Sequence, residues 1–298
     1  EGTLHNFEIG NMRFEDAGTD IGDYIHLENV QAAYIHDIAF YTPEENAIYL
    51  KTAYGCDIRR CRDFAGGKTF ISLVSSSHNY IADVQSGGMT AYGLQLNGSN
   101  VNFIVNFDEE NTKVGGVPIY LYQSNYNVIV NPFIATFPTK GVYIDGTTSA
   151  SRNNQINHGT IGGGQTGIYL GKASFTFIQF TRLDTNSLAD ITVTANAEDT
   201  VISDVILDSK TKISNSGIRT KVSIEVGYVT ENSGTAIILA STSVTFKHGL
   251  ASTPTLVLAS FSKTGWRSWK WSANSTHVTI TVEIRGTYTV YWYAEYKP

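Results

Sequence analysis

A short apolar motif that recurs along the chain constrains the fold more than any other feature of the sequence. Two apolar residues separated by one residue return at steps of 23, 23, 23, 25, 23, 26 and 23 residues. The successive pairs are Ile25/Leu27, Ile48/Leu50, Ile71/Leu73, Leu94/Leu96, Ile119/Leu121, Val142/Ile144, Ile168/Leu170 and Ile191/Val193. A nearly fixed period of this length is typical of one structural unit stacked on itself, as in a solenoid.

A second apolar column accompanies the first, in most turns ten residues later. Its members are Ile35, Ile58, Ile81, Ile104, Ile129, Ile156, Ile178 and Ile202. The residues between the columns alternate with a period of two and show no helical spacing, which indicates strands. We therefore predict an all-β fold whose first part, 1–212, is a single-stranded parallel β-helix of about eight coils of about 23 residues each. Coils about 4.8 Å apart would give a rod about 40 Å long.

The end of the chain has a different pattern. The period is lost after Ile213, and the turn-rich residues that follow predict a linker over 213–220. Short alternating segments then predict an antiparallel β-sandwich or jelly-roll-like module over 221–298, which would cap the last coil, cause trimerisation or bind glycan. We interpret the aromatic run in this module as core or subunit packing, and a lectin-like contact by Trp266 and Arg267 is the alternative.

The charge balance limits the class of partner. Lys and Arg number 21 against 27 Asp and Glu, which gives a net charge of −6, and the sequence has no basic run. This balance argues against nucleic acid and against an anionic membrane surface. No apolar run approaches the ~20 residues that span a bilayer, and no phosphate-binding, dinucleotide or zinc motif is found. We expect no membrane span, no cofactor and no metal.

Two sets of residues beside the second column raise the question of chemistry. The cysteines, Cys56 and Cys61, flank Ile58, and we expect them to be buried apolar residues, with a disulfide left open. The second set is polar and follows the column isoleucines by two residues: Asn11, Asp37, Arg60, Asp83, Asn106, Asn131, His158 and Asp204. A catalytic row is one interpretation. Because Asn and Asp tolerate tight-turn backbone angles, we favour a ladder of turn residues.

Three segments of the terminal module resemble a known class of protein. The runs Val244–Leu250, Thr253–Thr255 and Tyr291–Glu295 are similar to the small C-terminal β-modules of phage and archaeal-virus tail-spike or tail-fibre proteins. The preceding repeat resembles their pectate-lyase-like right-handed β-helix. This resemblance implies a homotrimer on a virion surface or outside a cell that binds, and often cleaves, surface polysaccharide. The chain lacks an initiating Met at Glu1, so we also expect an upstream attachment segment.

One outward column of the first strand is rich in tyrosine. The residues between the paired apolar positions must point outward. A tyrosine ring offers an apolar face to sugar C–H groups and a hydroxyl for polar contacts. We hypothesise a glycan-binding groove made of His26, Tyr49, Gln95, Tyr120, Tyr122, Tyr143 and Tyr169. The alternative is that tyrosine is a good strand former and stacks on itself between coils.

The outward positions of the second strand are apolar in the middle coils. A contiguous apolar surface of this kind marks an interface. We hypothesise that Tyr80, Phe103, Val105, Val128 and Val130 form a seam between the subunits of a homotrimer. A covering loop or a terminal arm is the alternative occupant.

Catalysis is the third hypothesis for function. Glycosidases need two carboxyl groups about 5 to 9.5 Å apart. Asp145 follows the tyrosine column, and Asp108 and Glu109 begin an inserted loop that could meet it at one rim. A second insertion, through Gly146–Arg152, is also expected to form a binding rim. The chain could thus be a polysaccharide hydrolase or lyase, or a structural adhesive protein without catalysis.

Overall fold

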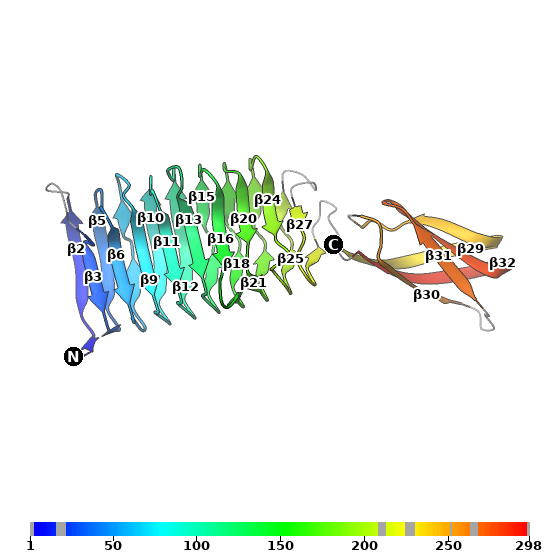
Figure 1. Cartoon of the computed structure of the whole chain (residues 1–298), viewed down its shortest axis with the longest axis horizontal. Helices are drawn as coiled ribbons and strands as arrows, with labels where there is room; N and C mark the ends of the chain where they lie inside the picture. Colours follow the sequence, from blue (N-terminus) through cyan, green and yellow to red (C-terminus); the bar gives the residue numbers. More distant parts are fainter. Residues whose placement is uncertain are drawn as a thin grey trace.

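The computed structural model describes residues 3–15, 22–207, 213–223, 230–250, 252–262 and 268–296. These residues form strands and no α-helix, so none of them belongs to a helix that could cross a membrane. Figure 1 shows a long stack of coils followed by a smaller β module. Glu1, Trp266 and Arg267, on which two expectations depend, lie outside the described residues.

The first apolar column forms one parallel sheet of nine strands, which we call face one. Its strands are β3 (Ile25–Glu28), β6 (Asn46–Lys51), β9 (Thr69–Val74), β11 (Tyr92–Asn97), β13 (Val117–Tyr122), β16 (Lys140–Asp145), β20 (Thr166–Leu170), β24 (Ala189–Val193) and β27 (Ile213–Asn215). Ile25 pairs with Ile48, and Ile48 pairs with Ile71. The predicted stacking of the column is therefore confirmed.

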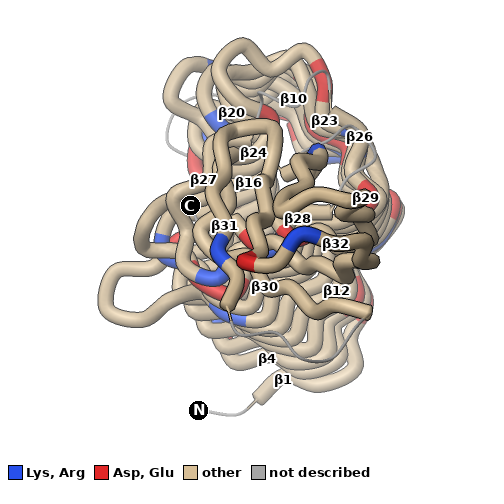
Figure 2. The backbone as a smooth tube through the Cα atoms, turned by 90° about the vertical axis from the view of Figure 1, so that its right-hand side faces the viewer, with Lys and Arg blue, Asp and Glu red and all other residues tan. Residues whose placement is uncertain are grey.

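The second column forms a further parallel sheet, face two. Its strands are β2 (Glu8–Phe14), β5 (Tyr34–Phe40), β7 (Asp57–Arg59), β10 (Tyr80–Gly87), β12 (Phe103–Glu110), β14 (Val128–Val130), β18 (Gln155–Asn157), β22 (Phe177–Gln179), β25 (Val201–Ser203) and β28 (Lys221–Ser223). Its isoleucines pair in register from Ile35 to Ile202. Figure 2, which looks along the stack from the terminal module, shows the coils lying behind one another.

A third row of strands closes each coil. We call it face three: β8 (Arg62–Asp63), β15 (Phe133–Ala135), β19 (Thr160–Gly162), β23 (Arg182–Asp184) and β26 (Ile206–Leu207), with the last residues of β5, β10 and β12. Short strands also pair at the edges: β1 (Leu4–His5) with β4 (Val30–Gln31), and β17 (Ser151–Arg152) with β21 (Ala173–Ser174). The three faces enclose a continuous apolar core.

The chain turns from face two to face three at the predicted ladder of polar residues. The eight residues of that ladder have left-handed φ angles between 51° and 61°. Asn106 donates to Asp83 at 2.7 Å, and Asn131 donates to Asn106 at 2.8 Å. Short polar side chains tolerate this backbone region and bond to their neighbours in adjacent coils. The interpretation of these residues as a turn ladder is therefore confirmed.

A second ladder, which the sequence analysis did not predict, is buried. Asn79, Asn102, Asn127 and Asn154 stack inside one corner, and each of the first three donates its side-chain amide to the next at 3.0, 2.9 and 3.1 Å. The same acceptor oxygens take backbone N–H groups, as in Asn79 to Asn102 at 3.1 Å. Satisfied in this way, buried amides hold adjacent coils in register. Both cysteines are free and buried.

The stack extends further than expected. Ile213 pairs with Ile191, and Val222 pairs with Ile202, so the stretch 213–220 is part of a coil instead of a linker. These partners lie 22 and 20 residues apart. This period is shorter than the usual 23 residues, so the regular repeat does not predict the pairing. The nine strands of face one correspond to about nine coils instead of eight.

The terminal module is antiparallel, as predicted. It consists of β29 (Glu231–Lys247), β30 (Leu256–Phe261), β31 (Trp269–Ala273) and the central β32 (His277–Glu295). Its own core includes Ile238, Ile280, Val290 and Trp292. In the part of the module that the structure describes there is one sheet instead of the two layers of a sandwich, because β29 and β32 run its full length with register shifts near Ser241.

Candidate functional site

A ladder of tyrosines lies on the outer surface of face one. Tyr120, Tyr143 and Tyr169 pair in register on β13, β16 and β20. Their ring centroids are 5.1 Å and 5.3 Å apart, and Tyr92 extends the row at 5.2 Å from Tyr120. All four side chains are partly exposed. We call these four residues the tyrosine ladder.

Tyr92 belongs to this ladder although strict strand alternation would turn it inward. Gly93 and Leu94 both face the interior: a Cβ on Gly93 would lie 2.7 Å from the Glu109 carboxylate inside the coil. Two consecutive inward residues leave the residue before them outside. The same holds for Lys140, since Gly141 and Val142 both face inward.

A sequence signal for this exception exists. A small residue precedes the first apolar column residue in several coils, at Ala47, Gly93, Gly141 and Gly167. Because the small residue fills the inward position, the residue before it is free to face solvent. This signal would have added Tyr92 and Lys140 to the predicted site.

The other predicted residues of face one lie at different distances from the tyrosine ladder. Gln95 pairs directly with Tyr120 and accepts a hydrogen bond from Ser72 at 3.2 Å. His26 and Tyr49 pack together with centroids 4.6 Å apart, but the coil of Ser72 separates them from Gln95. The structure brings Gln95 to the ladder and leaves His26 and Tyr49 as a separate pair.

The inserted segment after Asp145 forms a rim beside the tyrosine ladder. The Tyr122 hydroxyl bonds to the Thr147 hydroxyl at 2.6 Å, and Gln123 donates to the Thr148 hydroxyl at 2.8 Å. Lys172 Nζ donates to the carbonyl oxygen of Thr147 at 2.7 Å. The rim borders an open hollow of about 610 Å³, which we call the face-one hollow. It is lined by Tyr143, Asp145, Gly146, Thr147, Tyr169, Gly171, Lys172, Thr194, Ala195 and Asn196.

The Asp145 side chain is part of the wall of this hollow and holds neighbouring wall residues in place. One carboxylate oxygen accepts the hydroxyl of Tyr143, and the other accepts the backbone N–H of Lys172 at 2.8 Å. The pKa of Tyr143 is raised by burial and by its bond to the Asp145 carboxylate. Asp145 is the one carboxylate among the residues that line the hollow.

The structure does not bring Asp108 and Glu109 to Asp145. Both belong to β12 instead of a loop, and they lie at the start of face three, whereas Asp145 lies on face one. Glu109 is fully buried and accepts bonds from the hydroxyls of Ser86 and Thr112, the latter at 2.9 Å. Burial raises its pKa to about 8. The hypothesised carboxylate pair with Asp145 is therefore not formed, because the turn at Asn106 resets the alternation and turns Glu109 inward.

The predicted seam residues lie together on face two. Tyr80, Phe103 and Val128 pair in one row, and Val105 and Val130 pair in the next. Tyr80 and Phe103 have centroids 5.8 Å apart, and Phe103 is 41% exposed. Together the five residues make a contiguous apolar patch, the face-two patch.

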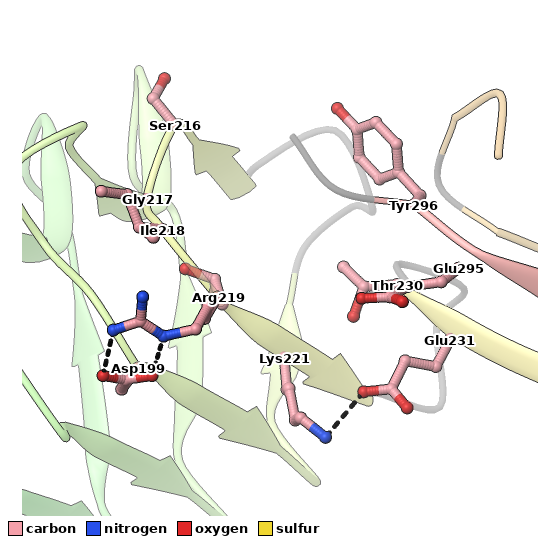
Figure 3. A pocket seen from close by; sticks show the side chains of 11 residues that line it. Asp199, Ser216, Gly217, Ile218, Arg219, Lys221, Thr230, Glu231, Glu295 and Tyr296 are labelled. Carbon is pink, nitrogen blue, oxygen red and sulfur yellow. Dashed lines mark hydrogen bonds and ion pairs between the residues drawn. The ribbon is translucent and has the colours of Figure 1, made fainter. Parts of the chain in front are cut away.

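A second hollow lies where the last coil meets the terminal module (Figure 3). It has a volume of about 520 Å³, and we call it the junction hollow. Arg219 forms ion pairs with Asp199 at 2.5 Å and with Glu198 at 3.0 Å. Lys221 of the coil pairs with Glu231 of the module at 3.0 Å. The cations of this hollow are therefore matched by carboxylates of the chain itself.

Comparison with known proteins gives one family and a group of structures. The family model described as "Periplasmic copper-binding protein (NosD)" matches residues 5–150, just under half of the chain. No curated protein matches. The tailspike protein gp49 of Pseudomonas phage LKA1 is 11% identical with a TM-score of 0.37, and the match covers 98% of this chain and 67% of that one.

Two further tailspike structures are similar. The Dettilon tailspike protein gp208 is 11% identical with a TM-score of 0.41, and the match covers 99% of this chain and 88% of that one. A mutant tailspike of E. coli bacteriophage HK620, in complex with a hexasaccharide, is 9% identical with a TM-score of 0.39, over 99% and 69% of the two chains. These three structures are phage tailspike proteins, and the similarity to each of them is one of fold.

The described residues do not fit the copper ion for which the matched family is named. Within them no group of three or more His, Cys, Asp or Glu side chains could hold a metal ion. Cys56 and Cys61 carry the softest donors but are buried, and burial raises the pKa of Cys61 to about 12. A thiol with so high a pKa stays protonated and is a poor ligand.

Proposed function

We propose that this chain is a tailspike-like receptor-binding protein that holds a cell-surface polysaccharide on its tyrosine ladder. The observation that carries the proposal is the alignment of Tyr92, Tyr120, Tyr143 and Tyr169 beside a rimmed hollow. Tyrosine rings offer a chain of sugars both apolar faces and hydroxyl groups. Tyr169 stands edge-on to Tyr143, at an interplanar angle of 87°, so the row is not one continuous stack of rings.

Binding is better supported than cleavage. Hydrolysis by paired carboxylates needs a second acid near the first. Asp145 is the one carboxylate lining the face-one hollow, and both of its oxygens are already bonded. These contacts give Asp145 the role of fixing the wall that the sugar would meet.

The binding test compares substitutions of Tyr143 on a panel of surface polysaccharides. Tyr143→Ala removes the ring and should weaken retention roughly tenfold, about 1.4 kcal/mol. Tyr143→Phe keeps the ring and should stay closer to the unmodified chain. Tyr54→Ala is the matched control, since Tyr54 is 51% exposed and lies outside face one. Retention unchanged by Tyr143→Ala would reject the ladder as the site, and shortened sugar chains in the mixture would reject a purely binding function.

We further propose a homotrimer on a virion surface or outside a cell, and the face-two patch supports the trimer. Three copies packed through this patch would remove Phe103 and its neighbours from water. Phe103→Asp should raise the dissociation constant of the assembly at least tenfold, because it places a charge in an apolar contact. Val114→Asp, at a side chain 91% exposed beyond β12, is the control. Sedimentation would contradict the trimer if the unmodified chain stayed monomeric at micromolar concentration.

A further inference from the structure

The ammonium group of Lys140 lies on the tyrosine ladder, where the Asp145 carboxylate acts on it at a distance and forms no ion pair with it. Its Nζ is 3.8 Å from the ring centroid of Tyr143 and 4.3 Å from that of Tyr169. Burial lowers the pKa of Lys140. Among the described residues no carboxylate lies within 4.0 Å of this ammonium. The rings attract the cation but provide no counter-charge.

Lys172, on the rim, is in a similar position. Its Nζ donates to the carbonyl oxygens of Thr147 and Thr148, at 2.7 and 3.3 Å, and within the described part of the chain it forms no ion pair. Asp145 cannot compensate both lysines, because it is the one carboxylate lining the hollow and carries a single negative charge. Two lysines and one aspartate leave this region with one excess positive charge, in a chain whose net charge is −6.

We propose that the face-one hollow, together with the adjoining Lys140, takes an acidic polysaccharide, with a sugar carboxylate on Lys140 and the sugar rings beside Tyr143 and Tyr169. This inference rests on the proposed glycan-binding function and names the class of its ligand. A uronic acid carries its carboxylate directly on the sugar ring, so one sugar unit can meet the tyrosine side chains and the adjacent ammonium together. A partly desolvated ammonium is unfavourable without a counter-ion, and a ligand carboxylate offsets that penalty through a charge-assisted hydrogen bond.

The same observations argue against a polyphosphate ligand. Nucleic acids carry dense charge and are bound by many Lys and Arg side chains. The site offers one ammonium, that of Lys172, on the rim of the hollow and one, that of Lys140, over the adjoining tyrosine rings. A lysine is a compact point charge with three donors, which suits single carboxylates spaced along an otherwise hydroxylated chain.

The test uses polygalacturonate, alginate and hyaluronan, each beside its carboxyl-reduced neutral form. Affinity electrophoresis of the full chain should show at least tenfold tighter binding of one or more acidic forms. Lys140→Gln should weaken that binding about tenfold, leave any binding of the neutral form unchanged, and reduce the salt dependence. Lys140→Arg should restore most of the affinity. Lys113→Gln, at an exposed lysine away from face one, should bind like the unmodified chain.

The outcomes separate this inference from the function on which it rests. Equal binding of acidic and neutral forms, weakened by Tyr143→Ala, would overturn the acidic ligand and leave glycan binding standing. Acidic forms bound equally by Lys140→Gln and the unmodified chain would overturn the assignment of Lys140. If the unmodified chain retained none of the polymers, and no neutral surface polysaccharide either, both proposals would fail. Thermal melting of each variant shows whether a loss reflects unfolding.

Discussion

The face-one hollow and the junction hollow are similar in volume, about 610 and 520 Å³. They differ in whether their charged side chains form ion pairs. In the junction hollow, Arg219 and Lys221 each contact a carboxylate from a different part of the chain. In the face-one hollow, Asp145 bonds only to neutral donors, and beside the hollow the Lys140 ammonium lies over aromatic rings without an ion pair. A cation that is already paired with a carboxylate of the chain is less available to a ligand. A charge left unmatched is available to a ligand.

The two hollows also differ in the regularity of the backbone that surrounds them. The tyrosine ladder lies on one regular sheet whose coils repeat, so neighbouring coils present like residues side by side. The junction joins two units with different cores, and its ion pairs link residues about 10 to 20 positions apart without a repeat. A repeated surface can recognise a repeated ligand such as a polysaccharide. The junction hollow has no repeated arrangement of side chains and cannot recognise a repeated ligand in this way.

The largest effect that sharpens this comparison concerns Glu109, a carboxyl group shut off from solvent and bonded to two hydroxyl groups. Glu109 is fully buried, and burial raises its pKa from 4.5 to about 8, with Asp63 and Asp108 nearby adding to the shift. Burial likewise raises the pKa of Asp63, to about 6. Between about pH 4.5 and 8 the folded chain binds the proton on Glu109 and the unfolded chain does not. Stability should therefore fall as pH rises through this window, on the order of 5 kcal/mol in total, and level off above it.

Thermal unfolding from pH 5 to 9 measures that slope. Glu109→Gln keeps the shape and cannot ionise, so its melting temperature should depend less on pH. Glu110→Gln, at the exposed neighbouring residue, is the matched control and should keep the full slope. An identical slope in Glu109→Gln and the unmodified chain would show that Glu109 is ionised in the fold at neutral pH, contrary to this account.

Periodicity explains how much of the architecture could be predicted from sequence. Ile48 and Ile71 repeat at a constant step, and strand alternation alone places Tyr120, Tyr143 and Tyr169 outside. Both inferences depend only on local geometry and a count of residues. The buried ladder from Asn79 to Asn154 was missed because amides inside a core are acceptable only when their partners in the next coil are known.

The residues that sequence reasoning missed or misplaced lie where the alternation is interrupted. Gly93 and Gly141 add a second inward residue, so Tyr92 and Lys140 face outward. The left-handed turn at Asn106 has the reverse effect on Glu109, which faces the core. The pairing of Arg219 with Asp199 could not be predicted either, because its ion pair depends on a coil that departs from the regular period.

The smallest expected effect tests the junction hollow directly. Arg219 is well exposed and pairs with Asp199 and Glu198 near the last coil. Exposed ion pairs contribute little to stability, since water and salt screen them. Arg219→Gln should therefore lower the melting temperature by about two degrees or less, and it should leave polysaccharide retention unchanged.

Lys140→Gln, which also removes one positive charge, is the matched comparison. It should change the melting temperature little and cause a clear loss of retention. If Arg219→Gln lost as much retention as Lys140→Gln, net charge alone would account for binding, and the distinction between matched and unmatched cations would have no functional meaning.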